Sequence, residues 1–130
     1  MLTQQQIGDF RKMLEQRFLE VRESVRQALL QADEQNYVEL AGRVGDLENS
    51  SLADLLVDVS LAEIDRLVGQ IRDIDASLLR IAHGSYGLCT DCGKEIEVAR
   101  LQAHPTAKRC RPCQMIYEES GREPHRSTSL

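Results

Sequence analysis

Four cysteines are the residues whose type and spacing point most directly to chemistry. They form two Cys-x-x-Cys pairs, Cys89 with Cys92 and Cys110 with Cys113, with 17 residues between the pairs. This arrangement fits the zinc pattern in which about 15–20 residues separate two such pairs. Two pairs complete a tetrahedron of thiolates, which leaves no coordination position for water. The spacing therefore predicts one structural Zn²⁺ and no catalytic metal.

Two other interpretations of the cysteines, a redox pair and a disulfide framework, depend on the compartment. The first residues, Met1 to Gln6, have neither a basic segment nor an apolar core, so they do not resemble a signal peptide. We therefore expect a cytoplasmic protein, and structural disulfides are rare there. His83 and His104 are not needed as ligands by a site of four cysteines.

Composition excludes several functional classes for this chain of 130 residues. It has 21 acidic and 16 basic residues and a net charge of −5, which argues against binding of nucleic acid by counterion release. Aromatic residues make up 4% of the chain, too few for a base-stacking platform. No apolar run reaches the roughly 18 residues of a membrane span. No motif groups Ser, His and Asp, so we expect no catalytic residues and no enzyme. We also expect no sequence-specific DNA binding and no membrane association.

A small basic cluster leaves one nucleic-acid alternative open. Its members surround the second cysteine pair: Arg100, Lys108, Arg109 and Arg111. Such residues also offset the negative charge of zinc thiolates, and a solvated basic face is the simpler interpretation.

The cysteines follow two long segments with helical periodicity. Thr3 and Gln6 have the spacing of a capping box. An a/d heptad seam follows, and no Gly or Pro interrupts residues 9–41, so we predict one helix from Thr3 to Leu40. The seam residues are Leu14, Phe18, Val21, Val25, Ala28 and Ala32.

A second helix is predicted over residues 52–83, after a polar connection at 42–51. Ser50 or Ser51 is the expected N-cap, and Gly84 is placed to end the helix as its C′ residue. Gly69 lies inside the helix and costs about 1 kcal/mol relative to Ala. The seam residues are Ile64, Leu67, Ile71, Ile74, Leu78 and Ile81.

Together these elements predict a protein dominated by α-helices. Residues 1–83 form a long antiparallel coiled-coil hairpin with its tip at about 42–51. Residues 84–120 form a four-cysteine zinc finger with a short terminal helix, and 121–130 form a disordered tail. We expect a monomer because the connection is short and the stripes match in length, although the same seam would also serve dimerisation.

The zinc segment resembles the DksA/TraR family of C4 zinc-finger proteins. The resemblance rests on four stretches: Gly84-Ser85-Tyr86-Gly87-Leu88-Cys89-Thr90-Asp91-Cys92-Gly93, Glu95-Ile96, Arg100-Leu101-x-Ala103-x-Pro105-Thr106-Ala107, and Cys110-x-x-Cys113. It implies a regulator of transcription that binds bacterial RNA polymerase through its secondary channel. The resemblance also implies that the coiled-coil tip approaches the active centre. This lowers the lifetime of promoter complexes, often together with the alarmone ppGpp.

The predicted tip departs from the family pattern Asp-x-x-Asp-x-Ala. Counted without gaps from the first zinc cysteine, the pattern begins at Asp46, but Asn49 replaces the second Asp and Ser51 replaces the Ala. Glu48 supplies a carboxylate at a different position. The partner-binding tip is therefore expected at Asp46, Glu48, Asn49 and Ser51. The alternative is a scaffold that binds another protein partner or lacks DksA-type regulatory activity.

The same count predicts a weak or absent ppGpp response. Arg66 matches a basic position of the family's alarmone surface, whereas Asp73 and Gln114 stand where lysines are expected. Loss of two cations removes most of the attraction for a polyanionic nucleotide.

Overall fold

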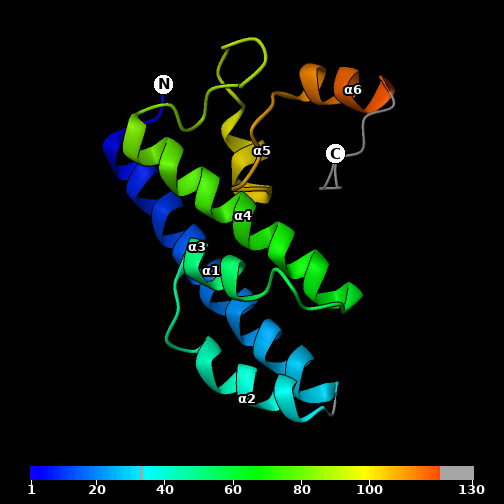
Figure 1. The fold of residues 1–130 in the computed structure, drawn as a ribbon. Coiled ribbons are helices and arrows are strands. Elements are labelled where there is room, and N and C mark those ends of the chain that lie inside the picture. Colours follow the sequence, from blue (N-terminus) through cyan, green and yellow to red (C-terminus); the bar gives the residue numbers. More distant parts are fainter. Residues whose placement is uncertain (33, 121–130) are drawn as a thin grey trace. The chain divides into compact units, whose positions relative to one another are not determined.

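The computed structural model describes residues 1–32 and 34–120, and the predicted tail at 121–130 lies outside them. Within this range the protein is built from helices, and the longest two, α1 and α4, run antiparallel (Figure 1). The only β-structure among these residues is an isolated bridge between Leu88 and Glu95. The prediction of an all-α fold is confirmed. The helices are α1 (Gln4–Gln31), α2 (Gln35–Val44), α3 (Asn49–Leu55), α4 (Ala62–His83), α5 (Val98–Ala103) and α6 (Arg111–Glu119).

Helix α1 begins at the predicted capping box. The backbone N–H of Thr3 donates to Gln6 Oε1 at 2.8 Å, and the N–H of Gln6 donates to Thr3 Oγ1 at 3.1 Å. These reciprocal bonds satisfy donors that have no partner inside the helix. The predicted seam is buried as far as Val25, and Leu29 is then buried in place of Ala28.

The prediction of two uninterrupted helices is wrong. Helix α1 ends at Gln31, and residues 35–40, predicted to continue it, belong to a separate helix, α2. The predicted second helix is likewise divided into α3 and α4, with residues 56–61 between them. The N-cap of α3 is Glu48, not Ser50 or Ser51, and the connection between α2 and α3 shrinks to residues 45–48.

Neither interruption contains Gly or Pro, so no helix-breaking residue accounts for them. The packing of the residues around them does. Apolar residues of α2, α3 and the segment after α3 are buried at 7% exposure or less: Ala41, Val44, Leu52, Ala53, Leu56 and Val59. Burial of such side chains stabilises more than the few tenths of a kcal/mol per residue by which helix propensities differ.

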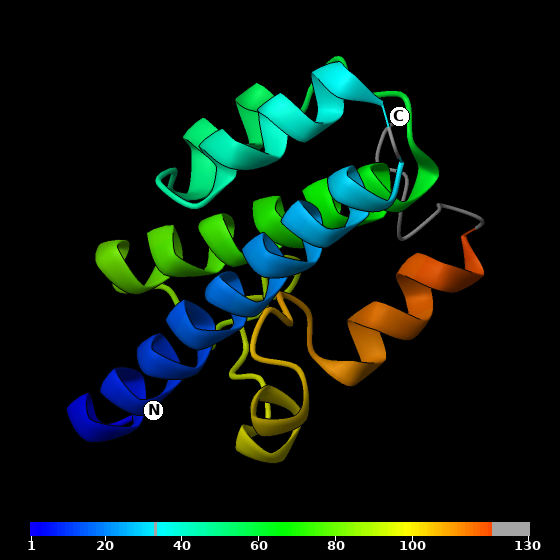
Figure 2. The same cartoon turned by 90° about the horizontal axis from the view of Figure 1, so that it is seen from below.

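The chain divides into two compact units, and unit 2 comprises Glu15–Asp75. In this unit α2 and α3 lie together on one side of the α1 and α4 segments (Figure 2). Arg22 of α1 donates from Nη1 to the carbonyl oxygen of Leu47 at 3.0 Å, which ties the turn between α2 and α3 to α1. The unit is therefore a small four-helix core with a tethered turn.

Unit 1 comprises Met1–Leu14 together with the chain from Ala76 onward. Here Phe10 of α1 packs against Tyr86, with ring centroids 5.6 Å apart. Gly84 ends α4 with φ of +78°, as predicted, and the next two N–H groups, of Ser85 and Tyr86, both donate to the carbonyl of Arg80. This turn leads the chain from α4 directly into the cysteine segment.

No helix in the described part of the chain is both long enough and apolar enough to cross a bilayer.

Two glycine substitutions, one inside α4 and one just after its end, should change stability in opposite directions. A Cβ at Gly69 meets no atom within 4 Å, so Gly69→Ala should raise the free energy of unfolding by about 1 kcal/mol. Gly84→Ala should lower it by about 1–2 kcal/mol, because an L-residue is strained at positive φ. Urea denaturation of the zinc-loaded protein measures both. A neutral Gly84→Ala would contradict the assigned helix end.

Candidate metal centre

The four cysteine sulfurs come together in unit 1. All of them lie within 4.8 Å of one another, and the Sγ atoms of Cys92 and Cys110 are 3.8 Å apart. A tetrahedral Zn²⁺ with Zn–S bonds of about 2.3 Å places its sulfur ligands roughly 3.8 Å apart. Both the donor set and its spacing therefore fit zinc, and the cysteines form a C4 zinc site. Four protein ligands close the coordination sphere, which makes the metal structural.

The first cysteine pair lies in a tight turn of the backbone. The N–H of Cys89 donates to the carbonyl of Lys94 at 2.7 Å, and the N–H of Gly93 donates back to the carbonyl of Cys89 at 2.9 Å. Gly93 has a φ of +77°, which permits the sharp reversal. The N–H of Asp91 points at Cys89 Sγ, 3.4 Å away. The loop thus places the sulfurs of Cys89 and Cys92 close to those of the second pair.

The second cysteine pair is placed by the start of α6. Cys110 is the N-cap of α6 and Cys113 lies in its first turn, with Pro at the helix start. The positive end of the helix dipole favours thiolates at these positions. A backbone hydrogen bond of 2.8 Å from Thr90 to the carbonyl of Lys108 joins the two cysteine loops.

The sulfurs differ in their tendency to ionise. Burial raises the pKa of the Cys89 thiol, but hydrogen bonds from the backbone N–H groups of Cys110, Cys92 and Asp91 outweigh it and lower the pKa to about 6. The pKa of Cys113 is raised, first by the neighbouring sulfur of Cys110, then by burial and by the other two cysteines. Four ionised sulfurs at this spacing therefore require a cation among them.

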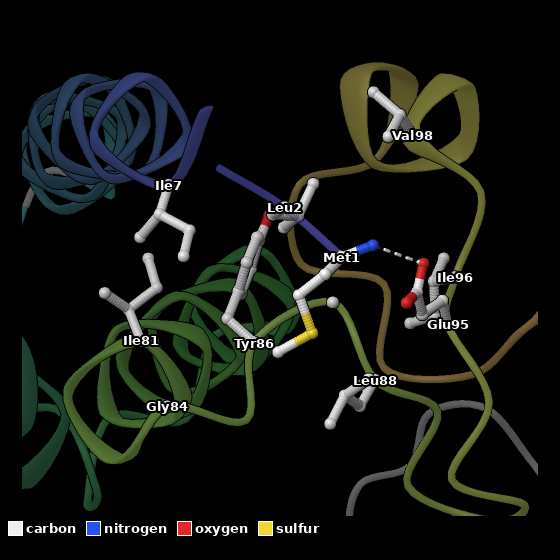
Figure 3. Close-up of a pocket in the computed structure, with 11 residues that line it drawn as sticks. Met1, Leu2, Ile7, Ile81, Gly84, Tyr86, Leu88, Glu95, Ile96 and Val98 are labelled. Carbon is white, nitrogen blue, oxygen red and sulfur yellow. Dashed lines mark hydrogen bonds and ion pairs between the residues drawn. The ribbon is translucent and has the colours of Figure 1, made fainter. Parts of the chain in front are cut away.

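One buried hydrogen bond holds the finger together, and two contacts join it to the first residues of the chain. The buried Tyr86 hydroxyl donates to the carbonyl of Pro105 at 2.7 Å, and burial raises the pKa of this phenol to about 12 against the opposing charge of Arg80. Leu2 packs on Gly87, where an added Cβ would lie 2.9 Å from Leu2 Cδ1. The amino group of Met1 pairs with Glu95 at 2.8 Å (Figure 3). A small cavity of about 80 Å³, lined largely by apolar residues, lies beside these contacts.

The predicted tip residues lie in unit 2, on and beside the turn at 45–48. Asp46 is exposed within the turn, and Glu48 is the exposed N-cap of α3 without a capping bond from its side chain. Asn49 and Ser51 belong to the first turn of α3, with Asn49 half-buried and Ser51 exposed. The structure thus groups all four near one turn.

The basic cluster of the finger is partly engaged in internal contacts. Arg109 donates to Asp91 and lies over Tyr117, and Arg100 donates to the carbonyl of Arg109 at 3.0 Å. Lys108 and Arg111 are exposed. Sequence reasoning assigned no such role to Arg109, and only its place next to Cys110 could have suggested one.

Comparison with known proteins places these features in a family context. Residues 84–119 match the profile of the prokaryotic dksA/traR C4-type zinc finger. The chain is 29% identical, over 119 residues, to the RNA polymerase-binding transcription factor DksA of Escherichia coli strain K12, which covers 90% of this chain and 74% of that protein. The protein of the same name from Caulobacter vibrioides is 37% identical over 78 residues, 60% of this chain and 50% of the relative.

A solved structure gives the same result. Transcription factor DksA2 from Pseudomonas aeruginosa superposes with a TM-score of 0.54 at 26% identity, over 92% of this chain and 88% of that chain. The similarity therefore extends over the helical segments as well as the finger.

Loss of one cysteine sulfur should prevent the finger from retaining zinc. Cys89→Ser removes the buried ligand, so the protein should lose zinc and melt at a lower temperature, because metal binding is linked to folding by several kcal/mol. Atomic absorption and thermal denaturation measure the two effects, and Ser85→Ala is a control outside the cysteine set. Full zinc content with unchanged melting would overturn the structural assignment.

Proposed function

Since this chain belongs to the DksA/TraR family through its C4-type zinc finger, we propose that it is a DksA-like regulator of transcription that binds bacterial RNA polymerase. The observation that carries the proposal is the relationship to a protein named RNA polymerase-binding transcription factor along 90% of this chain. The relationship covers both the helical part and the finger, which supports the proposal that the whole arrangement serves to bind the polymerase.

We further propose that the protein binds in the secondary channel of the polymerase. The turn at 45–48 approaches the active centre, and its exposed carboxylates, those of Asp46 and Glu48, are the partner-facing groups. Residues 1–83 carry a net charge of −6, and an acidic element is steered toward a basic channel. In this proposal the side chains of the turn regulate transcription, and the helices place them near the active centre.

Zinc has an indirect part in this proposal. When bound, the metal supplies folding free energy to the finger and no reacting group. The residues that hold it, Cys89, Cys92, Cys110 and Cys113, preserve the segment that follows α4. The chemistry at the polymerase active centre therefore depends on the turn and not on the finger.

A second candidate function follows from the composition of the turn. Asn49 places a half-buried amide where the family pattern has a carboxylate, and Arg22 holds the carbonyl of Leu47 against α1. An amide carries no charge to act near a metal-containing centre. The scaffold then binds another protein partner, or binds polymerase without DksA-type regulatory activity.

A site-specific photo-crosslinker at Asn49 separates these functions. With purified bacterial core RNA polymerase, we expect crosslinks to the rim of the secondary channel or to the trigger loop. Replacement of Asp46 by Asn should weaken the effect on promoter complexes, because the leading carboxylate of the turn is lost. Asp58→Asn is the matched control, since it removes the same charge from an exposed position between α3 and α4.

Absence of binding at micromolar concentrations would reject the polymerase proposal and support a scaffold that binds another protein partner. Crosslinks at Asn49 with no effect of the protein on promoter complexes would support polymerase binding without regulation. Equal effects of Asp46→Asn and Asp58→Asn would contradict a special role of the turn.

The response to ppGpp should be weak or absent. Arg66, the basic residue that matches the family's alarmone surface, pairs with Glu63 through both Nε and Nη2. Gln114 donates to Glu118 at 2.9 Å and offers no cation. Isothermal titration of ppGpp into polymerase should therefore detect no additional tight site when this protein is added. A new tight site would refute this expectation.

A further inference from the structure

Helix α6 has an unusual attachment to the finger. None of its residues is buried, and Met115 and Ile116 remain 52% and 61% exposed. A nine-residue helix without a buried face has little intrinsic stability in water. Cys113 connects it to the zinc site, and Tyr117, one turn further on, packs against Arg109. The orientation of α6 therefore depends on contacts made at its first turns.

Arg109 contacts three parts of the finger at once. Its Nε donates to Asp91 Oδ2 at 2.9 Å, and Asp91 lies between the two cysteines of the first pair. Its guanidinium carbon lies 3.8 Å from the centre of the Tyr117 ring, on α6. Its backbone carbonyl accepts a 3.0 Å hydrogen bond from Arg100 of α5. One residue thus bridges the first cysteine loop, α5 and α6.

The burial of the Arg109 side chain shows that the bridge is more than a surface ion pair. The Arg109 side chain is 14% exposed, while that of Asp91 is 44% exposed. Isolated exposed pairs contribute little to stability. Here the guanidinium group bonds a carboxylate and lies over an aromatic ring at the same time. The planar guanidinium of Arg can make both contacts, whereas the compact ammonium group of Lys cannot.

We propose that Arg109 is a positioning residue of the zinc site. It fixes the first cysteine loop against the second and couples both to α6, so that zinc retention and the order of α6 depend on the same guanidinium. Asp91 transmits the effect to Cys89 and Cys92, and Tyr117 transmits it to the helix. The proposal concerns this chain's own zinc site and does not depend on the proposed binding of polymerase.

Zinc release provides the first test. Zinc-loaded full-length variants are mixed with an excess of the chelating dye 4-(2-pyridylazo)resorcinol, and the release rate is measured. Arg109→Gln should release zinc at least tenfold faster, because loss of outer-shell contacts typically costs 10–100-fold in metal affinity. Arg111→Gln is the matched control: it removes the same charge on the other side of Cys110 from an exposed side chain, and it should release zinc at the parent rate.

Two further variants separate positioning from charge. Arg109→Lys keeps the charge but cannot bond Asp91 and cover Tyr117 together, so it should remain impaired. Amide hydrogen exchange in α6 should become faster in Arg109→Gln and stay unchanged in Arg111→Gln. Full rescue by Arg109→Lys, or equal release from the Arg109→Gln and Arg111→Gln variants, would overturn the proposal in favour of simple charge compensation.

Asp91→Asn keeps the test decisive if Arg109→Gln does not fold with zinc. This variant leaves the guanidinium on Tyr117 and removes only the charge that it bonds. Faster zinc release together with faster exchange in α6 supports the coupling. Release at the parent rate overturns it.

Discussion

Four ionised sulfurs cannot share one small volume without a positive charge among them, and the C-terminal part of the protein depends on this constraint. Two like charges about 4 Å apart repel by roughly 4 kcal/mol at an effective dielectric constant of 20. Every pair of sulfurs here lies within 4.8 Å. Against the effect of burial, backbone N–H groups lower the pKa of Cys89, whereas the pKa of Cys113 is raised, first by the sulfur of Cys110, as expected from this repulsion. A divalent cation removes it.

The finger is arranged around that cation because it has little apolar core of its own. Apart from Gly87, its buried residues are few: Tyr86, Cys89, Ile96, Leu101 and Pro105. The backbone instead supplies N–H groups to Cys89, a left-handed glycine at 93 and a helix start at Cys110. Metal ligation takes the place that buried side chains have in unit 2. The finger therefore presents α6 without burying any of its residues.

Features set by neighbouring residues could be predicted from the sequence. The cysteine spacing, the Thr3–Gln6 capping box and the helix end at Gly84 depend on contacts a few positions apart, and the structure contains all three. The separation of α1 from α2 and the interruption at residues 56–61 depend on burial between distant segments, which a heptad seam does not encode. The Arg22–Leu47 and Arg109–Asp91 contacts have no local signal either. The role of the turn residues Asp46 to Ser51 stays a prediction, because it depends on a partner.

The two units place different demands on the growing chain. Unit 2 is one continuous stretch, so all its packing partners exist as soon as residue 75 has been synthesised. The segment 1–14 is made first but packs with residues made last, across a separation of more than sixty positions. Contacts between distant positions form late because closing a long loop costs entropy. The packing of residues 1–14 against the segment from residue 76 onward should therefore form after the helical core of unit 2.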